Sequence, residues 1–200
     1  MTKLLLTSVG LANQNILNKF LEAVDNPVSE IKIIFVTTAA RSEEELRYVN
    51  QSKMELLNLG IPEGNIKTFT LNLPASFDEV KDFDVVYICG GNTFFLLHKV
   101  RETGFDKVLN EFVNSGKLYL GVSAGSILAG PNIDIASPFD ENDVNIKVLE
   151  GLNFTDVVVS LHYKDVEEPI IKPFTEKFKV IPITDDQAVY INNGNIELIV

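Results

Sequence analysis

The segment KLYLGVSAGSILAG, residues 117–130, places a serine between two glycines, directly after one apolar run and directly before another. The run KLYLGVS is typical of a buried strand, and the G-x-S-x-G pattern forces a sharp turn from that strand into a helix. Such a turn lifts the Ser123 hydroxyl clear of the sheet, and the helix start offers backbone N–H groups to a developing negative charge. The segment predicts a nucleophile at Ser123; the alternative is a small residue needed for helix–sheet packing.

The rest of the chain repeats this alternation of apolar strands and helical segments. Early strands are expected in KLLLTSVG (3–10), EIKIIFVTTAA (30–40), NIKTFTLN (65–72) and DVVYICGG (84–91). Helices are expected in NQNILNKFLEAV (13–24), SEEELRYVNQSKMELLNLG (42–60) and TFFLLHKVRETG (93–104). Late strands are expected in TDVVVSLHY (155–163), KVIPIT (179–184) and QAVYINNGNIELIV (187–200), the last with an Asn193-Gly194 hairpin signal.

These elements predict a single α/β domain over residues 1–200. Continuous apolar strands, each followed by a helix, indicate a mostly parallel sheet with helices on both faces. The C-terminal hairpin should add antiparallel strands at one edge. In such sheets ligands bind outside the carboxyl ends of the strands, so residues that directly follow a strand are the best candidates for a site.

The amino-acid composition limits the binding partners and the cellular compartment that we expect for this protein. The net charge of −11 opposes binding to nucleic acid or to an anionic membrane surface. The one cysteine cannot form an internal disulfide, and the N-terminal apolar stretch is too short for a signal segment or a membrane span, so we expect a cytoplasmic protein. The acidic surface is compatible with a monomer or a homodimer.

A serine nucleophile needs a base, and the sequence holds two histidines. His98 lies inside the helical pattern TFFLLHKV, where a surface or core histidine is the ordinary interpretation. His162 follows the apolar run DVVVSL, so its imidazole is expected at the same sheet edge as Ser123. We therefore predict His162 as the base.

The carboxylate that orients the imidazole is less determined. Asp185 and Asp186 follow the strand KVIPIT, which would deliver an acid to the edge that carries Ser123 and His162. Asp134 and Asp140 lie between the serine and the histidine in the chain, and Asp140 belongs to the acidic loop SPFDEND (137–143). Strand-end position favours Asp185, then Asp186, with Asp134 and Asp140 left as alternatives.

The segment YICGGNTFFLL (87–97) puts two glycines and an asparagine after a strand. Backbone N–H groups exposed there would form one half of an oxyanion hole, and the amide of Ala124 would form the other. Asn92 and Thr93, at the start of the following helix, are candidate substrate-binding residues. A phosphate-binding loop is the competing interpretation, but neither a G-x-G-x-x-G pattern nor a P-loop lysine is present. Cys89 is expected to be buried and unreactive.

The blocks ICGGNTFFLL, GVSAGSILAG, LHY and TDDQA together resemble peptidase family S51, which contains dipeptidase E and the cyanophycinases. The resemblance implies a serine hydrolase on a sheet similar to class I glutamine amidotransferases, with Ser123 as the nucleophile and His162 as the histidine. It also implies that Gly91 and Ala124 supply the oxyanion donors. For the acid it points to both the 134–140 region and Asp185.

Two features depart from the family pattern. The dipeptidase branch is marked by arginines downstream of the histidine, whereas HYKDVEEPIIKPFTEKF (162–178) contains lysines and no arginine. Lys164 or Lys172 could supply positive charge to a substrate, without the bidentate fork of arginine. The chain is also shorter than typical cyanophycinases, which argues against a polymer substrate.

The expected function is hydrolysis of short peptides through a Ser-His-Asp acyl-enzyme mechanism, with no metal or organic cofactor. The alternatives are a serine esterase or amidase that does not cleave peptides, and a catalytically silent domain that binds a small ligand.

Overall fold

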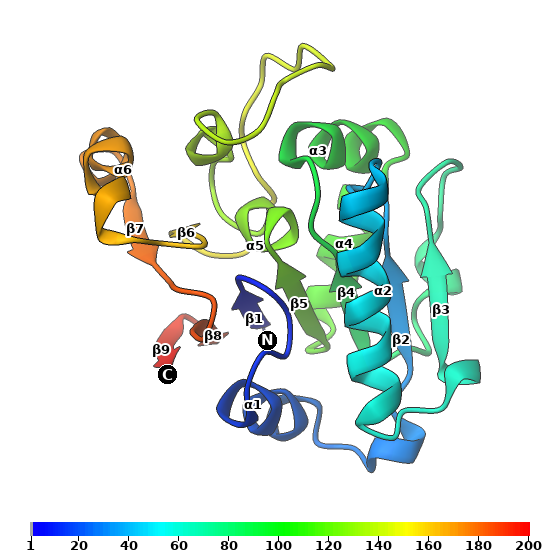
Figure 1. Ribbon diagram of the computed structural model, residues 1–200. Helices are drawn as coiled ribbons and strands as arrows, with labels where there is room; N and C mark the ends of the chain where they lie inside the picture. The colour runs from blue at the N-terminus through cyan, green and yellow to red at the C-terminus, as the bar shows by residue number, and fades with distance from the viewer. Residues whose placement is uncertain (1) are drawn as a thin grey trace.

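The computed structural model describes residues 2–200, and its main sheet has seven strands in the order β3-β2-β4-β5-β1-β8-β9 (Figure 1). Its strands are β1 (Lys3–Thr7), β2 (Ile33–Val36), β3 (Ile66–Phe69), β4 (Val85–Ile88), β5 (Leu118–Val122), β8 (Ala188–Asn192) and β9 (Asn195–Ile199). The first five pair in parallel, and β8 and β9 are antiparallel. The predicted mostly parallel sheet with a C-terminal hairpin is confirmed.

Helices cover both faces of the sheet because successive strand residues point to opposite sides. In β1, Leu5 packs in one hydrophobic cluster with Phe20, while Leu4 and Leu6 pack in the other with Phe94. The first face carries α1 (Gln14–Val24) and α2 (Glu43–Asn58); the second carries α3 (Thr93–Glu102), α4 (Phe105–Asn114) and α5 (Ala124–Leu128). Within residues 2–200, none of the helices combines the length and apolar character needed to cross a membrane.

Helix α4 has no counterpart among the elements predicted from the sequence. Its apolar residues recur at the spacing of one helix face, and all are buried against the sheet: Phe105, Val108, Leu109, Phe112 and Val113. This pattern is visible in FDKVLNEFVN, directly after Gly104. The predicted helix 93–104 and the helix α4 are thus two helices separated by a turn, with Gly104 in the left-handed conformation at φ 71°.

The strands β6 (Val157–Ser160) and β7 (Lys179–Pro182) form a separate two-stranded parallel sheet instead of extending the main one. The helix α6 (Glu168–Thr175) connects them, and Figure 1 shows this unit beside the main sheet. Strand β6 is buried against the main body, whereas β7 is only half-buried. We call residues 157–186, which include β6, α6 and β7, the small-sheet unit.

The C-terminal hairpin forms as its sequence predicts. Asn193 and Gly194 both have positive φ, 50° and 83°, which is the requirement of a two-residue type I′ turn. The strands β8 and β9 pair in register across it, from Asn192 with Asn195 outward. Strand β8 also pairs with β1, so the hairpin closes the edge of the sheet next to the strand that precedes Ser8.

Candidate active site

Ser123 lies on the turn between β5 and α5, in a backbone conformation that residues with a side chain rarely adopt. Its φ is 49° and its ψ is −116°. The Ser123 N–H donates to the Thr7 carbonyl at 3.0 Å, and the Ser123 carbonyl accepts from the Ser126 N–H at 2.7 Å. Strain of this kind costs roughly 1–3 kcal/mol and persists only where the surroundings fix it. The turn therefore holds the Ser123 side chain out from the end of the sheet, as the pattern predicts.

The second glycine of the pattern is required by close backbone packing. A Cβ on Gly125 would lie 2.3 Å from the Ile88 carbonyl oxygen, so no side chain fits between α5 and β4. Beneath the turn, the Ser126 hydroxyl lies 2.8 Å from the Thr7 carbonyl and 2.7 Å from the Gly121 carbonyl, and it accepts from the Thr7 N–H. The last serine of GVSAGS therefore has a structural role, and Ser123 is the serine that faces the cleft.

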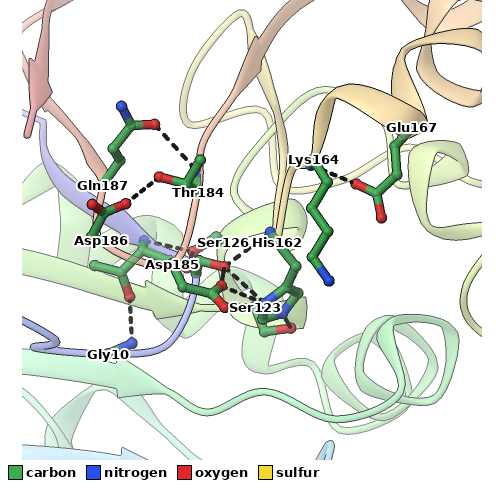
Figure 2. Close-up of polar contacts among 12 residues, drawn as sticks. Gly10, Ser123, Ser126, His162, Lys164, Glu167, Thr184, Asp185, Asp186 and Gln187 are labelled. Carbon is green, nitrogen blue, oxygen red and sulfur yellow. Dashed lines mark hydrogen bonds and ion pairs between the residues drawn. The ribbon is translucent and has the colours of Figure 1, made fainter.

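His162 and Asp185 come from the ends of β6 and β7 and meet Ser123 (Figure 2). The Ser123 Oγ lies 3.5 Å from His162 Nε2, and His162 Nδ1 lies 2.7 Å from Asp185 Oδ1. The serine–histidine distance is at the outer limit of a hydrogen bond, which is common in hydrolases without substrate. The three side chains form one continuous line of contacts, in the order that nucleophilic catalysis uses.

Asp185 is kept ionised by its partners. Partial burial raises the pKa of the Asp185 carboxyl, but hydrogen bonds from Ser8 and His162, with the charge of Lys164, outweigh burial and leave the pKa below its ordinary value. An ionised carboxylate favours the tautomer in which His162 Nδ1 carries the proton. Nε2 then has a free lone pair toward Ser123.

The other acids weighed from the sequence contact different groups. Asp186 points away from His162 and accepts a hydrogen bond from the Thr184 hydroxyl (Figure 2). Asp134, in the short helix η4 (Asp134–Ala136), accepts from the Ser137 hydroxyl at 2.7 Å. Asp140 accepts from the Thr93 N–H at 2.7 Å and caps α3. Of the four candidates, the structure places Asp185 against the imidazole.

The glycine turn after β4 lies directly beside Ser123. A Cβ on Gly90 would be 2.9 Å from the Ser123 Cβ, and one on Gly91 would be 2.2 Å from the Ala39 carbonyl oxygen. Gly91 has a φ of 133°, so both conformation and space require glycine. Among residues 2–200 the Gly91 N–H has no hydrogen-bond acceptor. Ala124 is the first residue of α5, where the N–H has no acceptor within the helix.

Asn92 and Thr93 tie the acidic loop to the start of α3. The Asn92 side chain accepts from the Phe95 N–H at 2.8 Å and donates to the Glu141 carbonyl at 2.8 Å. Arg41 pairs with Asp143 at 2.6 Å, which fixes the loop from the α2 side. The Asn92 side chain is thus buried and bonded within the protein and lines neither of the cavities at Ser123, while Thr93 lines one of them.

Two cavities meet at Ser123 and His162. The larger, about 610 Å³, lies against α2 and is lined by Tyr48, Val49 and Ser52 together with Asp185. The smaller, about 220 Å³, is lined mainly by apolar side chains: Ile127, Ile135, Phe139, Val159 and Leu161. Volumes of this order suit ligands of a few hundred daltons.

The charged side chains that line these cavities are acidic. Glu45 lines the larger cavity with Asp185, and Asp140 and Glu167 line the smaller. Neither lining includes an arginine or a lysine of residues 2–200. Lys164 lies near His162 (Figure 2), close enough for its charge to act on Asp185. Lys172 lies on α6 outside both linings.

Sequence reasoning gave no role to Ser8, which the structure places behind the imidazole. Its hydroxyl lies 2.7 Å from Asp185 Oδ1 and 3.0 Å from His162 Nδ1. The signal available in the sequence was its position, because Ser8 directly follows β1 at the carboxyl edge of the sheet. A polar residue at that edge qualified as a candidate by the same rule that selected His162.

Two further residues behave as the sequence indicates. His98 lies on the surface of α3 with its Nε2 3.9 Å from Glu102, away from Ser123. Burial raises the pKa of the Cys89 thiol, so it carries no reactive thiolate at neutral pH. Across residues 2–200 the structure brings no three His, Cys, Asp or Glu side chains into a cluster that could hold a metal ion.

Comparison with known proteins gives one family. The profile of peptidase family S51 matches residues 4–199. The uncharacterized peptidase Lmo0363 of Listeria monocytogenes is 32% identical over 171 residues, which cover 82% of this chain and 83% of that protein. The uncharacterized peptidase PM1590 of Pasteurella multocida is 30% identical, covering 90% and 89%. Peptidase E of Salmonella arizonae is 26% identical, covering 82% and 75%.

A solved structure shows the same fold over the full length. It is a crystal structure from Listeria monocytogenes EGD-e, provisionally named a peptidase E protein, with a TM-score of 0.83 and 28% sequence identity. The superposition covers 99% of this chain and 98% of that one.

Proposed function

Because this chain belongs to peptidase family S51, we propose that it is a serine-type peptidase that hydrolyses short peptides through an acyl-enzyme formed on Ser123. The observation that carries this proposal is the line of contacts from Ser123 Oγ to His162 Nε2 and from His162 Nδ1 to Asp185. The strained turn at Ser123 supports it, since strain of this kind clusters at reactive groups.

In the proposed reaction, His162 Nε2 takes the proton of Ser123 as the hydroxyl attacks the peptide carbonyl. The tetrahedral intermediate collapses when the imidazolium returns this proton to the leaving amine. Water then enters, loses a proton to His162 and hydrolyses the ester, which restores Ser123. Asp185 stabilises the imidazolium through the contact with Nδ1 and stays ionised throughout.

The negative charge on the intermediate is assigned to the amides of Gly91 and Ala124. The support is that Gly91 and Ser123 line the same cavity, that Ala124 directly follows Ser123, and that within residues 2–200 neither N–H has a hydrogen-bond acceptor. Fixed donors of this type contribute about 10²- to 10³-fold each in related chemistry. Their place at the turn after β4 and at the start of α5 follows from the two glycine-containing segments of the sequence.

The substrate is proposed to be a peptide of a few residues whose side chain next to the scissile bond is neutral or basic. The volumes of the two cavities support the size, and the acids Glu45, Asp140 and Glu167 support the charge. A carboxylate side chain in either cavity would face like charges without an arginine partner. Lys164 and Thr93 border the site, and we assign Lys164 to the terminal carboxylate of the peptide.

The test is covalent labelling with a fluorophosphonate, followed by a panel of dipeptides analysed by mass spectrometry. We expect labelling of the wild type and of Ser126→Ala, no labelling of Ser123→Ala, and faster cleavage of Lys-led or Leu-led than of Asp-led dipeptides. An unlabelled wild type that cleaves no dipeptide contradicts the proposal. Labelling with hydrolysis of esters but no peptides would favour the esterase alternative.

A further inference from the structure

Ser8 has a buried hydroxyl that contacts both His162 and Asp185. Its residue is 1% exposed, directly after the end of β1. The hydroxyl lies 2.7 Å from Asp185 Oδ1 and 3.0 Å from His162 Nδ1, and it accepts the His162 backbone N–H at 3.0 Å. No other side-chain hydroxyl among residues 2–200 contacts both His162 and Asp185.

The hydrogen-bond donors and acceptors of Ser8, His162 and Asp185 can be counted. A serine hydroxyl has one hydrogen and two lone pairs. One lone pair takes the His162 N–H, so the hydrogen is free to go to the carboxylate, which is only an acceptor. Asp185 Oδ1 then receives two hydrogen bonds, one from Ser8 and one from Nδ1–H of His162. This arrangement is satisfied only when the imidazole proton is on Nδ1.

We propose that Ser8 is a positioning residue of the site, which holds Asp185 and the His162 backbone so that Nε2 faces Ser123. The His162 backbone has a φ of 54°, a conformation that needs an external partner, and the bond from its N–H to Ser8 is that partner. The same hydroxyl fixes the carboxylate against Nδ1. The hydroxyl of Ser8 contacts Asp185 and His162 rather than Ser123, so Ser8 acts through these two residues.

The burial of Ser8 supports a specific role. Asp185 and His162 have side chains that are 60% and 50% exposed, so water competes for their contact. Ser8 lies on the main sheet behind them and is shielded from solvent. A hydrogen bond from a buried donor to an exposed carboxylate fixes the carboxylate on the rigid sheet rather than on the small-sheet unit. This inference rests on the proposed function, since it assigns Ser8 to the same reaction.

The test is a double-mutant cycle with Ser8→Ala, Asp185→Asn and the combined variant, measured as kcat and KM on the best dipeptide. A hydrogen bond to a charged group is worth about 10- to 100-fold. We expect Ser8→Ala to lower kcat by that factor with KM nearly unchanged, and to add less than about threefold in the Asp185→Asn background. The same loss in both backgrounds would overturn the inference, because a merely structural serine acts independently of Asp185.

Three further variants separate positioning from folding. Ser8→Thr keeps the hydroxyl and should restore most of kcat. Ser8→Cys keeps the size with a weak donor and replaces Ser8→Ala in the cycle if the alanine variant does not fold. Thr103→Val removes a buried hydroxyl at the far end of α3 and should lower thermal stability while leaving kcat unchanged.

The outcomes also distinguish the two proposals. If Ser123→Ala retains full activity, the proposed function fails. If Ser123→Ala is inactive but Ser8→Ala retains the wild-type kcat, only the role of Ser8 fails.

Discussion

The turn that carries Ser123 and the small-sheet unit that carries His162 and Asp185 are built differently. Every residue of β5 is buried, and the turn after it is fixed by hydrogen bonds to β1 and within α5. Strand β7 is half-buried and, within residues 2–200, pairs only with β6. The nucleophile thus stands at the end of a buried strand of the main sheet, and its base and acid stand on a two-stranded sheet that is partly exposed.

This difference shows where the geometry of the site is set. Ser123 and His162 both have positive φ, 49° and 54°. At Ser123 the turn is flanked by Gly121 and Gly125 and its N–H donates to the Thr7 carbonyl of β1, whereas the His162 N–H donates to Ser8, which is 154 residues away. The serine turn is thus built into the main sheet, while the imidazole is aligned by a contact between the small-sheet unit and the main sheet.

The largest effect should come from removing the acid of the small-sheet unit. Asp185→Asn is expected to lower kcat by about 10³- to 10⁴-fold, because the neutral amide no longer stabilises the imidazolium or holds Nδ1 protonated. Steady-state kinetics on dipeptides measures it. Asp186→Asn is the matched control and should stay within about threefold, since that side chain contacts Thr184. Full turnover in Asp185→Asn, or a larger loss in Asp140→Asn, would contradict the assignment.

The second effect concerns the stability of the turn region. Gly125→Ala should lower the free energy of unfolding by about 3 kcal/mol, because the added Cβ would lie 2.3 Å from the Ile88 carbonyl oxygen. Chemical denaturation measures the loss. Gly64→Ala is the control, because no atom lies within 4 Å of the added Cβ there, and we expect a change within about 0.5 kcal/mol. Equal stability of the two variants would show that the turn tolerates movement.

The third prediction compares amide hydrogen exchange in the two regions of the unmutated protein. Amides of β6 and β7 should exchange hydrogen about 10- to 100-fold faster than those of β1 and β5, because the two-stranded sheet has fewer partners that must open together. Mass spectrometry of peptic fragments covering residues 156–184 and 117–123 gives the comparison. Equal protection in both fragments would mean that the small-sheet unit opens only with global unfolding.

The smallest effect is a dependence of stability on pH. Because the folded pKa of Asp185 is lowered, the carboxylate contributes stability that is complete above its unfolded pKa, about 3.9, and is lost as the pH falls through the folded pKa. The side chain is 60% exposed, so the gain stays below about 1 kcal/mol. Wild type should therefore exceed Asp185→Asn in stability at pH 7 and approach it near pH 3. A stability difference between the two proteins that grows as the pH falls would contradict this prediction.

Much of the fold could be predicted from the sequence because the relevant signals are local. The apolar runs of β1, β2, β4 and β5 and the caps of α1 and α2 lie within single segments, and the Asn193-Gly194 turn is encoded by two residues. The apolar spacing of α4 was an equally local signal, directly after Gly104, that the sequence prediction left unassigned. The separation of β6 and β7 into their own sheet has no such signal, since a buried strand has the same pattern in either sheet.

The sequence by itself determined the Ser123 turn, the glycines beside it and the position of His162 at a strand end. These follow from the G-x-S-x-G and GGN patterns and from the place of His162 after an apolar run, which are signals within single segments. Only the tertiary structure decided that Asp185, rather than Asp134, Asp140 or Asp186, meets the imidazole, and that Ser8 lies behind both. The contacts His162–Asp185, His162–Ser8 and Ser8–Asp185 span 23, 154 and 177 positions of the sequence. Their distances depend on how the small-sheet unit packs on the main sheet.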